Sequence, residues 1–271
     1  MKTLVVSGGQ LYLGGLFSLV GGLPSEGLAA IDRATFAQAS RQPPGAMRLV
    51  NTLLAAHGRI YAAGAFTSVT SPAGNIALTD TLGTPAAGLP LCDGTIEVIE
   101  SDGAGGWFVG GYFSLVGGVS RRSLARVLPD GSVDAAWNAE LLSEASVLAL
   151  TRVGARLYVG GYSLRTVSAQ NATMVALDVA TAARVLAGSV VSNAVVTSIG
   201  ANADSVWFGG QFSAVNGQPR SCLASVLASN GALTTWAPLV TFAGNQPSVL
   251  AVEYANGVVH AGGSFSVVGG P

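Results

Sequence analysis

The segment Trp107-Phe-Val-Gly-Gly-Tyr-Phe113 is rich in aromatic residues and runs into a pair of glycines. The same pattern recurs five more times, at Leu11-Tyr-Leu-Gly-Gly-Leu-Phe17, Ile60-Tyr-Ala-Ala-Gly-Ala-Phe66, Leu157-Tyr-Val-Gly-Gly-Tyr-Ser163, Val206-Trp-Phe-Gly-Gly-Gln-Phe212 and Val259-His-Ala-Gly-Gly-Ser-Phe265. Counted on the second glycine, the steps between copies are 49, 47, 50, 49 and 53 residues. Self-similarity at a nearly constant period is the signature of a repeat protein.

Each repeat is expected to contain four antiparallel strands. An apolar run such as Val147-Leu-Ala-Leu150 precedes each glycine pair, and turn residues separate the two, so they form a hairpin. A third strand follows, as at Leu124-Ala-Arg-Val127, and the turn Pro129-Asp-Gly131 leads to a fourth, more polar strand that carries Trp137. A period of this size suits one four-stranded blade. The sequence therefore predicts an all-β fold, a β-propeller of about six four-stranded blades.

The whole chain, residues 1–271, is predicted to be a single β-propeller repeat array. Its repeats are approximately 1–48, 49–94, 95–144, 145–193, 194–246 and a partial repeat, 247–271. The last repeat stops at Gly269-Gly-Pro271, just past its second strand, so the last blade is expected to be incomplete in this chain. Because exposed sheet edges are normally covered or paired, we expect a longer protein or strands from another chain to complete this blade.

Positions that recur in every repeat are predicted to be structural. An aromatic residue or His260 lies three residues before the second glycine, and phenylalanine, or Ser163 in one repeat, lies two residues after it. Rings at such positions pack between blades, and glycine lets backbones approach closely. A carbohydrate-stacking platform is the alternative for the aromatic line. The predicted structural positions are Tyr12, Gly15, Phe17, Tyr61, Gly64, Phe66, Phe108, Gly111, Phe113, Tyr158, Gly161, Trp207, Gly210, Phe212, Gly263 and Phe265.

The composition limits the partners that this protein can have. Only 10% of residues are charged, against a usual figure of about 25%. With a net charge of -1, the chain lacks the basic surface that nucleic acid requires, so no nucleic-acid partner is expected. Glycines and polar residues interrupt every apolar run well before the roughly 18 residues of a spanning helix, so no membrane insertion is expected. A surface with few charges favours association with other proteins or further copies.

Residues for catalysis, cofactors or metals do not form a recognisable pattern. The only histidines are His57, at a predicted turn, and His260, in the aromatic line. A hydrolase triad needs a histidine close to a nucleophile and an acid, and no Cys/His spacing suits a metal. Cys92 and Cys222 fall in different repeats and are predicted to be free thiols. No catalytic, cofactor-binding or metal-ligating residue is therefore predicted.

The densest group of carboxylates is Glu97, Glu100 and Asp102, around the first hairpin of the third repeat. Paired carboxylates across the mouth of a propeller could hydrolyse a glycoside. A solvated strand edge explains the same residues equally well. The hydrolase interpretation therefore stays open as an alternative.

Residues 107–137 and 206–236 resemble the delta-60 repeat β-propellers. The repeat of that family runs aromatic-valine-Gly-Gly-x-Phe, then Val-x-Gly, Arg, Leu-Ala-Arg and Asp-Gly before a closing aromatic residue. The resemblance covers essentially the whole chain, although Ala63 replaces the leading glycine of the second repeat and Ser163 the phenylalanine of the fourth. Arg121 or Arg122, and Arg220, correspond to the arginine of the family.

This resemblance implies a bacterial, commonly extracytoplasmic module within a larger cell-surface or secreted protein, without established catalytic residues. Met1-Lys2 leads directly into a predicted strand, so no leader is recognised in this chain. We expect a non-enzymatic structural or interaction module, located outside the cell or at its surface, with protein partners or self-assembly. A glycan-binding propeller and a propeller glycoside hydrolase are the alternatives.

Overall fold

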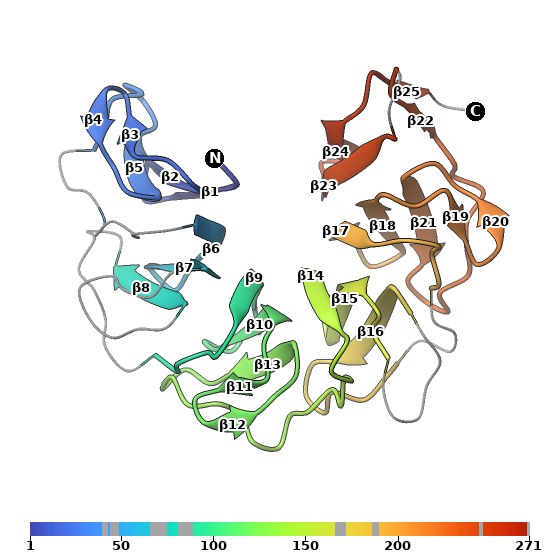
Figure 1. The fold of residues 1–271 in the computed structure, drawn as a ribbon, viewed down its shortest axis with the longest axis horizontal. Coiled ribbons are helices and arrows are strands. Elements are labelled where there is room, and N and C mark those ends of the chain that lie inside the picture. The colour runs from blue at the N-terminus through green and yellow to red at the C-terminus, as the bar shows by residue number, and fades with distance from the viewer. Residues whose placement is uncertain are drawn as a thin grey trace. The chain divides into compact units, whose positions relative to one another are not determined.

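The computed structural model describes residues 1–39, 43, 49–65, 75–80, 89–165, 172–185, 190–243 and 246–269. All regular structure within these ranges is β-strand. The chain divides into two compact units, Met1–Ala135 and Ala136–Pro271. Figure 1 shows that the main sheets of each unit lie side by side. The prediction of an all-β fold is confirmed for these residues.

Unit 1 contains three antiparallel sheets of three strands, and in each the second strand of the hairpin lies in the middle. The sheets are β1 (Thr3–Ser7), β2 (Gln10–Gly14) and β5 (Leu28–Asp32); β6 (Leu49–Ala56), β7 (Arg59–Ala65) and β8 (Ile76–Asp80); and β9 (Thr95–Ser101), β10 (Trp107–Tyr112) and β13 (Leu124–Val127). Two small hairpins accompany them, β3 (Leu19–Val20) with β4 (Leu23–Pro24), and β11 (Leu115–Val116) with β12 (Val119–Ser120).

Unit 2 repeats this plan with a smaller last sheet. Its main sheets are β14 (Ser146–Val153), β15 (Arg156–Tyr162) and β16 (Met174–Asp178); β17 (Val196–Ala201), β18 (Ser205–Gly210) and β21 (Leu223–Leu227); and β23 (Ser248–Ala255) with β24 (Val258–Ser264). Two smaller pairs are β19 (Ala214–Val215) with β20 (Gln218–Pro219), and β22 (Leu239–Thr241) with β25 (Val267–Gly269).

The predicted hairpins and third strands are confirmed, but the fourth strand differs from the prediction. In the described residues after four of the third strands, isolated bridges are found in place of a regular ladder: Ile31 with Gln38, Val127 with Val133, Met174 with Val190 and Leu177 with Arg184, and Val226 with Leu233. Trp137 and Trp236 lie outside strands. Side chains there form hydrogen bonds with backbone groups that a strand would otherwise pair. The Asp130 carboxylate accepts from the Ser132 N–H, and Arg121 donates to the carbonyls of Asp134 and Ala135. A regular ladder is therefore not required at this outer edge.

The small hairpins were not predicted, although their turns have a local signature. Gly21 and Gly22 have φ angles of 58° and 81°, and Asn216 and Gly217 have 48° and 76°. Two successive residues with positive φ form a type I′ turn, which suits the twist of a two-residue hairpin. The Val-x-Gly pattern of the repeat thus encodes an extra hairpin between the second and third strands.

In five of the six hairpins the glycine pair, or Ala63 and Gly64, faces a β-bulge in the first strand of the same hairpin. In β14 and β15 the register shifts between Val147 and Ala149, opposite Gly160 and Gly161. A Cβ on Gly161 would overlap the carbonyl oxygen of Ser146, whereas a Cβ on Gly160 would lie 2.8 Å from a methyl carbon of Val196 in the next sheet. Close approach between sheets therefore explains the first glycine only. The second is required by the bulge, which brings the partner backbone unusually close.

We expect Gly161→Ala to lower the free energy of unfolding by about 1–3 kcal/mol, because the added methyl group must displace backbone. The matched control is Gly262→Ala, whose Cβ would meet only the Cβ of Ala251 at 3.9 Å. Urea unfolding of both variants measures the difference. Equal losses in the two variants would show that the bulge does not require a second glycine.

The core lies between successive sheets of each unit, and the repeated aromatic position contributes to it. The rings of Tyr61 and Trp107, from neighbouring sheets, have centroids 4.7 Å apart. Tyr158 belongs to a buried cluster with Val196 and Ile199 of the next sheet. An aromatic ring that projects from one sheet thus fills the space in front of the next sheet, and this contact packs successive sheets of a unit together.

The predicted structural positions differ in exposure. The buried ones are Tyr12, Gly15, Tyr61, Gly64, Phe108, Gly111, Phe113, Tyr158, Gly161, Gly210 and Phe212. Phe17, Trp207 and Phe265 are half-buried, and Gly263 and His260 are exposed. Trp207 stacks on Tyr254 of the next sheet, with ring centroids 4.6 Å apart. Phe66 lies outside the described residues.

Candidate functional site

Asp102 is the most constrained of the candidate carboxylates. It lies in the loop after β9 with 1% of its side chain exposed, and it accepts hydrogen bonds from Arg126 Nη2 at 2.8 Å and from the N–H groups of Ala104 and Gly106. Burial by itself raises the pKa of Asp102, but the hydrogen bonds and charge of Arg126 and the two N–H donors outweigh burial and hold it below the usual value. A general acid of a glycosidase needs a raised pKa. Asp102 is therefore an ionised anchor for its loop.

Glu97 and Glu100 have other partners. Glu97 Oε2 lies 3.4 Å from Lys2 Nζ, and the ammonium group also donates to Asn51 Oδ1 at 2.7 Å. Glu100 Oε1 accepts from the N–H of Ser101 at 3.2 Å. The two carboxylates of a glycosidase flank one bond of the sugar. Glu97 and Glu100 thus contact different groups, and these contacts do not support a catalytic pair of carboxylates.

Polar side chains on the first strands connect neighbouring sheets. In unit 2, Thr151 Oγ1 donates to the carbonyl of Ile199 at 2.7 Å, and Thr197 Oγ1 donates to that of Val249 at 2.6 Å. In unit 1, the Asn51 amide donates to the carbonyl of Ile96 at 2.9 Å. Because each bond joins one first strand to the next, these polar residues serve the packing of the sheets.

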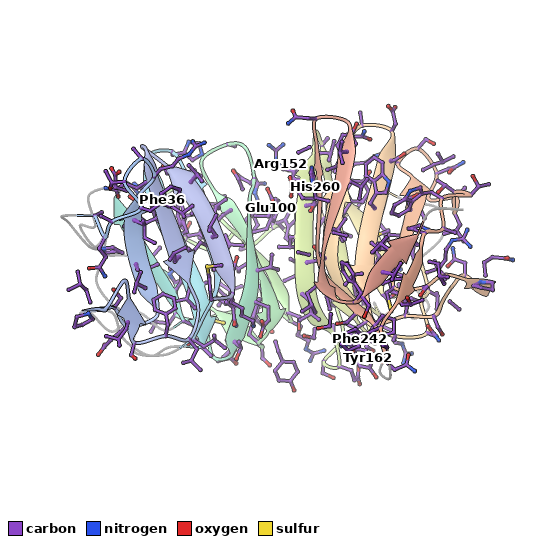
Figure 2. The ribbon with its side chains drawn as sticks, turned by 90° about the horizontal axis from the view of Figure 1, so that it is seen from above. Phe36, Glu100, Arg152, Tyr162, Phe242 and His260 are labelled. Carbon is purple, nitrogen blue, oxygen red and sulfur yellow. The ribbon has the colours of Figure 1, made fainter. Side chains whose placement is uncertain are left out.

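The two histidines lie in different structural settings. His57 is exposed at the turn between β6 and β7, with φ of 51°. His260 is exposed in the middle of β24, opposite Glu253 in the register. Figure 2 shows His260 and, toward the other end of the strands of unit 2, Tyr162. Among the residues that the structure describes, no three His, Cys, Asp or Glu side chains are grouped so that they could hold a metal ion.

Both cysteines are free thiols, as predicted, and the structure shows that both are buried. Burial, partly offset by a hydrogen bond from the Gly94 backbone, raises the pKa of Cys92 to about 11. The thiolate is the nucleophilic form, so Cys92 is poorly suited to catalysis at neutral pH. Cys222 immediately precedes β21 in a left-handed conformation, with φ of 62°.

The arginine of the repeat holds the segment that follows the third strand. Arg121 is buried, and its guanidinium donates to the carbonyls of Ser120, Asp134 and Ala135 at 2.8, 3.1 and 2.7 Å. In the fifth repeat, Arg220 donates in the same way to Pro219 and Thr234. The planar guanidinium suits this fork of carbonyls. The repeated arginine is thus bound to backbone in both repeats.

We expect Arg121→Lys to lower the free energy of unfolding by about 2 kcal/mol, because one ammonium group cannot satisfy three divergent carbonyls. Arg122→Lys is the matched control, since Arg122 is exposed. Thermal unfolding followed by circular dichroism compares the two. A larger loss for Arg122→Lys would contradict this role.

Several apolar side chains remain exposed on the small two-stranded sheets. In unit 1, Leu16, Leu19 and Leu23 surround β3 and β4 and are 75%, 59% and 53% exposed. In unit 2, Leu239 and Val267 are exposed on β22 and β25. This feature was not predicted from the sequence, because the small hairpin of β3 and β4 was not predicted. The type I′ turns and their flanking leucines were the available signal.

Two exposed tyrosines occupy the residue after the glycine pair. Tyr112 ends β10 in unit 1 and Tyr162 ends β15 in unit 2, and both rings are more than half exposed. The residues at this position in the other repeats are Leu16, Ala65, Gln211 and Ser264. This position therefore varies while the glycines before it are retained.

No helix in the described part of the chain has the length and apolar character needed to cross a membrane.

The comparisons with known proteins agree on the fold. The profile of a β-propeller domain of unknown function, DUF5122, matches residues 105–136. The WD40 β-propeller domain of Doa1 superposes with a TM-score of 0.60 at 12% identity, over 97% of this chain and 77% of that one. This chain has a β-propeller fold. No curated protein matches its sequence.

Two further solved structures are similar to this chain over nearly its whole length. The computationally designed Ika8 protein has a TM-score of 0.64 at 13% identity, over 99% of this chain and 70% of that one. A chain of the mitotic checkpoint complex has a TM-score of 0.65 at 16% identity, over 96% of this chain and 70% of that one. At such identities the likeness concerns the fold alone.

Proposed function

We propose that this chain is a non-enzymatic β-propeller module that binds other proteins or further copies of itself. The observation that carries the proposal is the exposed apolar surface of Leu16, Leu19 and Leu23 around the first small hairpin. Large apolar side chains grouped on a surface mark interaction sites. The similar WD40 domain of Doa1 and the chain of the mitotic checkpoint complex are consistent with a scaffold of this kind.

Variation between repeats supports the choice of this surface. In the fifth repeat Ala214 and Gln218 occupy the positions of Leu19 and Leu23 in their small hairpin. The shape of the hairpin is retained while its apolar side chains change. Repeat proteins use conserved positions for packing and variable surface positions for recognition.

The finer features of the module are part of the proposal. We infer six repeats of the delta-60 type and a place within a larger bacterial cell-surface or secreted protein. The repeat pattern of residues 107–137 supports the family, and the DUF5122 match over residues 105–136 covers nearly the same stretch. The scarcity of charge supports a surface that is partly covered in the working protein.

Sedimentation velocity tests the proposal. We expect the wild-type chain to associate as concentration rises, and a Leu16→Ser, Leu19→Ser, Leu23→Ser variant to need roughly tenfold higher concentration for the same association. Leu91→Ser is the control, because Leu91 is exposed in the same unit outside this hairpin. A wild-type chain that stays monomeric at every concentration would contradict self-association, and identical behaviour of the triple variant would exclude this surface.

A glycan-binding surface is the second candidate, favoured by the exposed rings of Tyr112 and Tyr162. Exposed aromatic faces can stack on sugar rings. A glycan array with the wild-type chain and the Tyr112→Ala and Tyr162→Ala variants tests this function. Specific binding that is lost in either variant would favour it, and the absence of binding would exclude it.

A further inference from the structure

The outer edge of β24 differs from its counterparts in the other sheets. The second strands β2, β7, β10, β15 and β18 each pair with a first strand on one side and a third strand on the other. Within residues 246–269, β24 pairs with β23 only. One edge of β24 therefore presents N–H and C=O groups without a strand, a template for a further strand.

The five complete sheets show what occupies the equivalent edge. The first residue of each third strand lies opposite the first glycine of the pair or its replacement, in the pairs Gly14–Leu28, Ala63–Ile76, Gly110–Leu124, Gly160–Met174 and Gly209–Leu223. The next residue is alanine in four of them and valine in β16. A large apolar residue followed by a small one is thus the rule at this edge. In β24 the equivalent glycine is Gly262.

The side chains of β24 are less covered than those of its counterparts. Val259 and Ala261 are half-buried, whereas Leu157 and Val159, at the same positions of β15, are buried. A Cβ on Gly262 would meet only Ala251, at 3.9 Å. The interface that joins each second strand to its third strand elsewhere is therefore left uncovered at β24.

The described strands near the termini are already paired. β1 pairs with β2 along its length, and the N–H of Lys2 donates to the carbonyl of Gly14. β25 pairs with β22. Neither β1 nor β25 therefore pairs with β24 in the described part of the chain.

We propose that the outer edge of β24 binds an extended peptide segment by antiparallel β-augmentation. The segment carries the third-strand pattern of the repeat, a large apolar residue, a small residue, any residue and a β-branched or apolar residue. Its large residue lies opposite Gly262 and its small residue opposite Ala261. Backbone hydrogen bonds supply affinity, and this side-chain pattern supplies specificity. The inference does not rest on the proposed function, because such an edge would accept a strand in a scaffold, a lectin or an enzyme.

The third repeat shows which N–H groups of the segment face β24. There the N–H of Gly111 donates to the carbonyl of Ser123, and the N–H of Asp134 donates to the carbonyl of Arg126 on the far side of β13. Because bonding groups alternate along an antiparallel strand, Ala125 and Val127 face β10 and Arg126 faces away. On β24, the corresponding groups belong to Val259, Ala261 and Gly263.

Binding of a synthetic peptide tests the proposal. The probe is the acetylated peptide of residues 122–135, which contains the third strand and the turn after it, added to the full 271-residue chain. We expect saturable one-to-one binding by fluorescence anisotropy. We also expect at least roughly tenfold slower hydrogen exchange of the Val259, Ala261 and Gly263 amides.

Two modified peptides identify the binding mode. N-methylation of Ala125 and Val127 removes the donors that face β24, so binding should weaken by roughly tenfold or more. N-methylation of Arg126, the matched control, should change it by less than about twofold because that group faces away. Equal losses in both peptides, no saturable binding, or binding without protection of the three amides would overturn the proposal.

A protein variant gives an independent readout. Proline is tolerated on an edge strand where its missing N–H would face solvent, so Ala261→Pro is expected to fold but to lose peptide binding. Unchanged binding by a folded Ala261→Pro variant would overturn the proposal, and the peptide comparison decides if this variant does not fold. If the three amides become protected without peptide as the protein concentration rises, the strand bound at this edge comes from a second copy of the chain, and the peptide proposal is wrong. The Leu16→Ser, Leu19→Ser, Leu23→Ser variant leaves β24 unchanged, so its self-association and the peptide binding at β24 are measured independently. The two proposals can therefore fail separately.

Discussion

Tyr158→Ala is expected to lower the free energy of unfolding by about 3–5 kcal/mol. The ring is 1% exposed and lies in a cluster with Val196, Ile199 and Phe208 of the next sheet. Removing it takes away the apolar contacts on both sides and leaves a cavity between two sheets, which the β-ladders around it cannot collapse to fill. Urea unfolding with tryptophan fluorescence measures the loss.

The matched control for Tyr158→Ala is His260→Ala, because His260 occupies the same repeat position on β24 and is exposed. We expect its effect to stay within about 0.5 kcal/mol. Trp207→Ala should lie between the two, because that ring is half-buried and stacks on Tyr254. If Tyr158→Ala and His260→Ala cost the same, the aromatic position does not act through packing between sheets.

Asp102→Ala is expected to lower the free energy of unfolding by about 3–5 kcal/mol at neutral pH. The change removes the 2.8 Å partner of Arg126, whose side chain is 16% exposed, and leaves it only the more distant Asp134 carboxylate at 3.6 Å. It also removes the acceptor for the Ala104 and Gly106 amides. Asp130→Ala is the control, because Asp130 makes a similar turn contact with Ser132 at an exposed site. A smaller loss for Asp102→Ala than for Asp130→Ala would contradict the anchoring role.

The contribution of Asp102 should depend on pH in a defined direction. Its pKa is lower in the folded protein than in the unfolded chain, because Arg126 and two backbone N–H groups outweigh the effect of burial. The stabilisation is therefore complete above the unfolded pKa of about 3.9 and is lost as the pH falls through the folded value. The difference in stability between the wild type and Asp102→Asn should be constant near neutral pH and should narrow below about pH 4. A difference that widens on acidification would contradict the lowered pKa.

The repeat, the hairpins and the third strands could all be predicted from the sequence. These features depend on neighbours in the chain: apolar runs at strand period, turn residues between them, and glycine pairs at nearly constant spacing. Val147 to Leu150, Gly154 and the segment from Leu157 form the predicted hairpin because their pairing is local. The small hairpins were also within reach, since the two glycines after Val20 and after Val116 carry the signature of a type I′ turn.

The outer segment of each repeat was predicted less well. A polar strand was expected around Trp137, yet the chain there forms one bridge and is held by Arg121 from sixteen positions earlier in the sequence. The arginine was recognised as part of a motif, but its role depends on which carbonyls come within reach after folding. A side chain that bonds to backbone in this way replaces the ladder that a strand would need.

Residues at the same repeat position can have different surroundings, and this difference is seen only in the folded structure. Tyr158 and His260 occupy the same repeat position, but one is buried against a following sheet and the other is exposed on β24. Asp102 stood among three candidate carboxylates, and its pairing with Arg126, twenty-four positions later, shows it to be an anchor. The physical reason is that burial and pKa depend on distances between segments far apart in the sequence, whereas strand and turn preferences depend on adjacent residues.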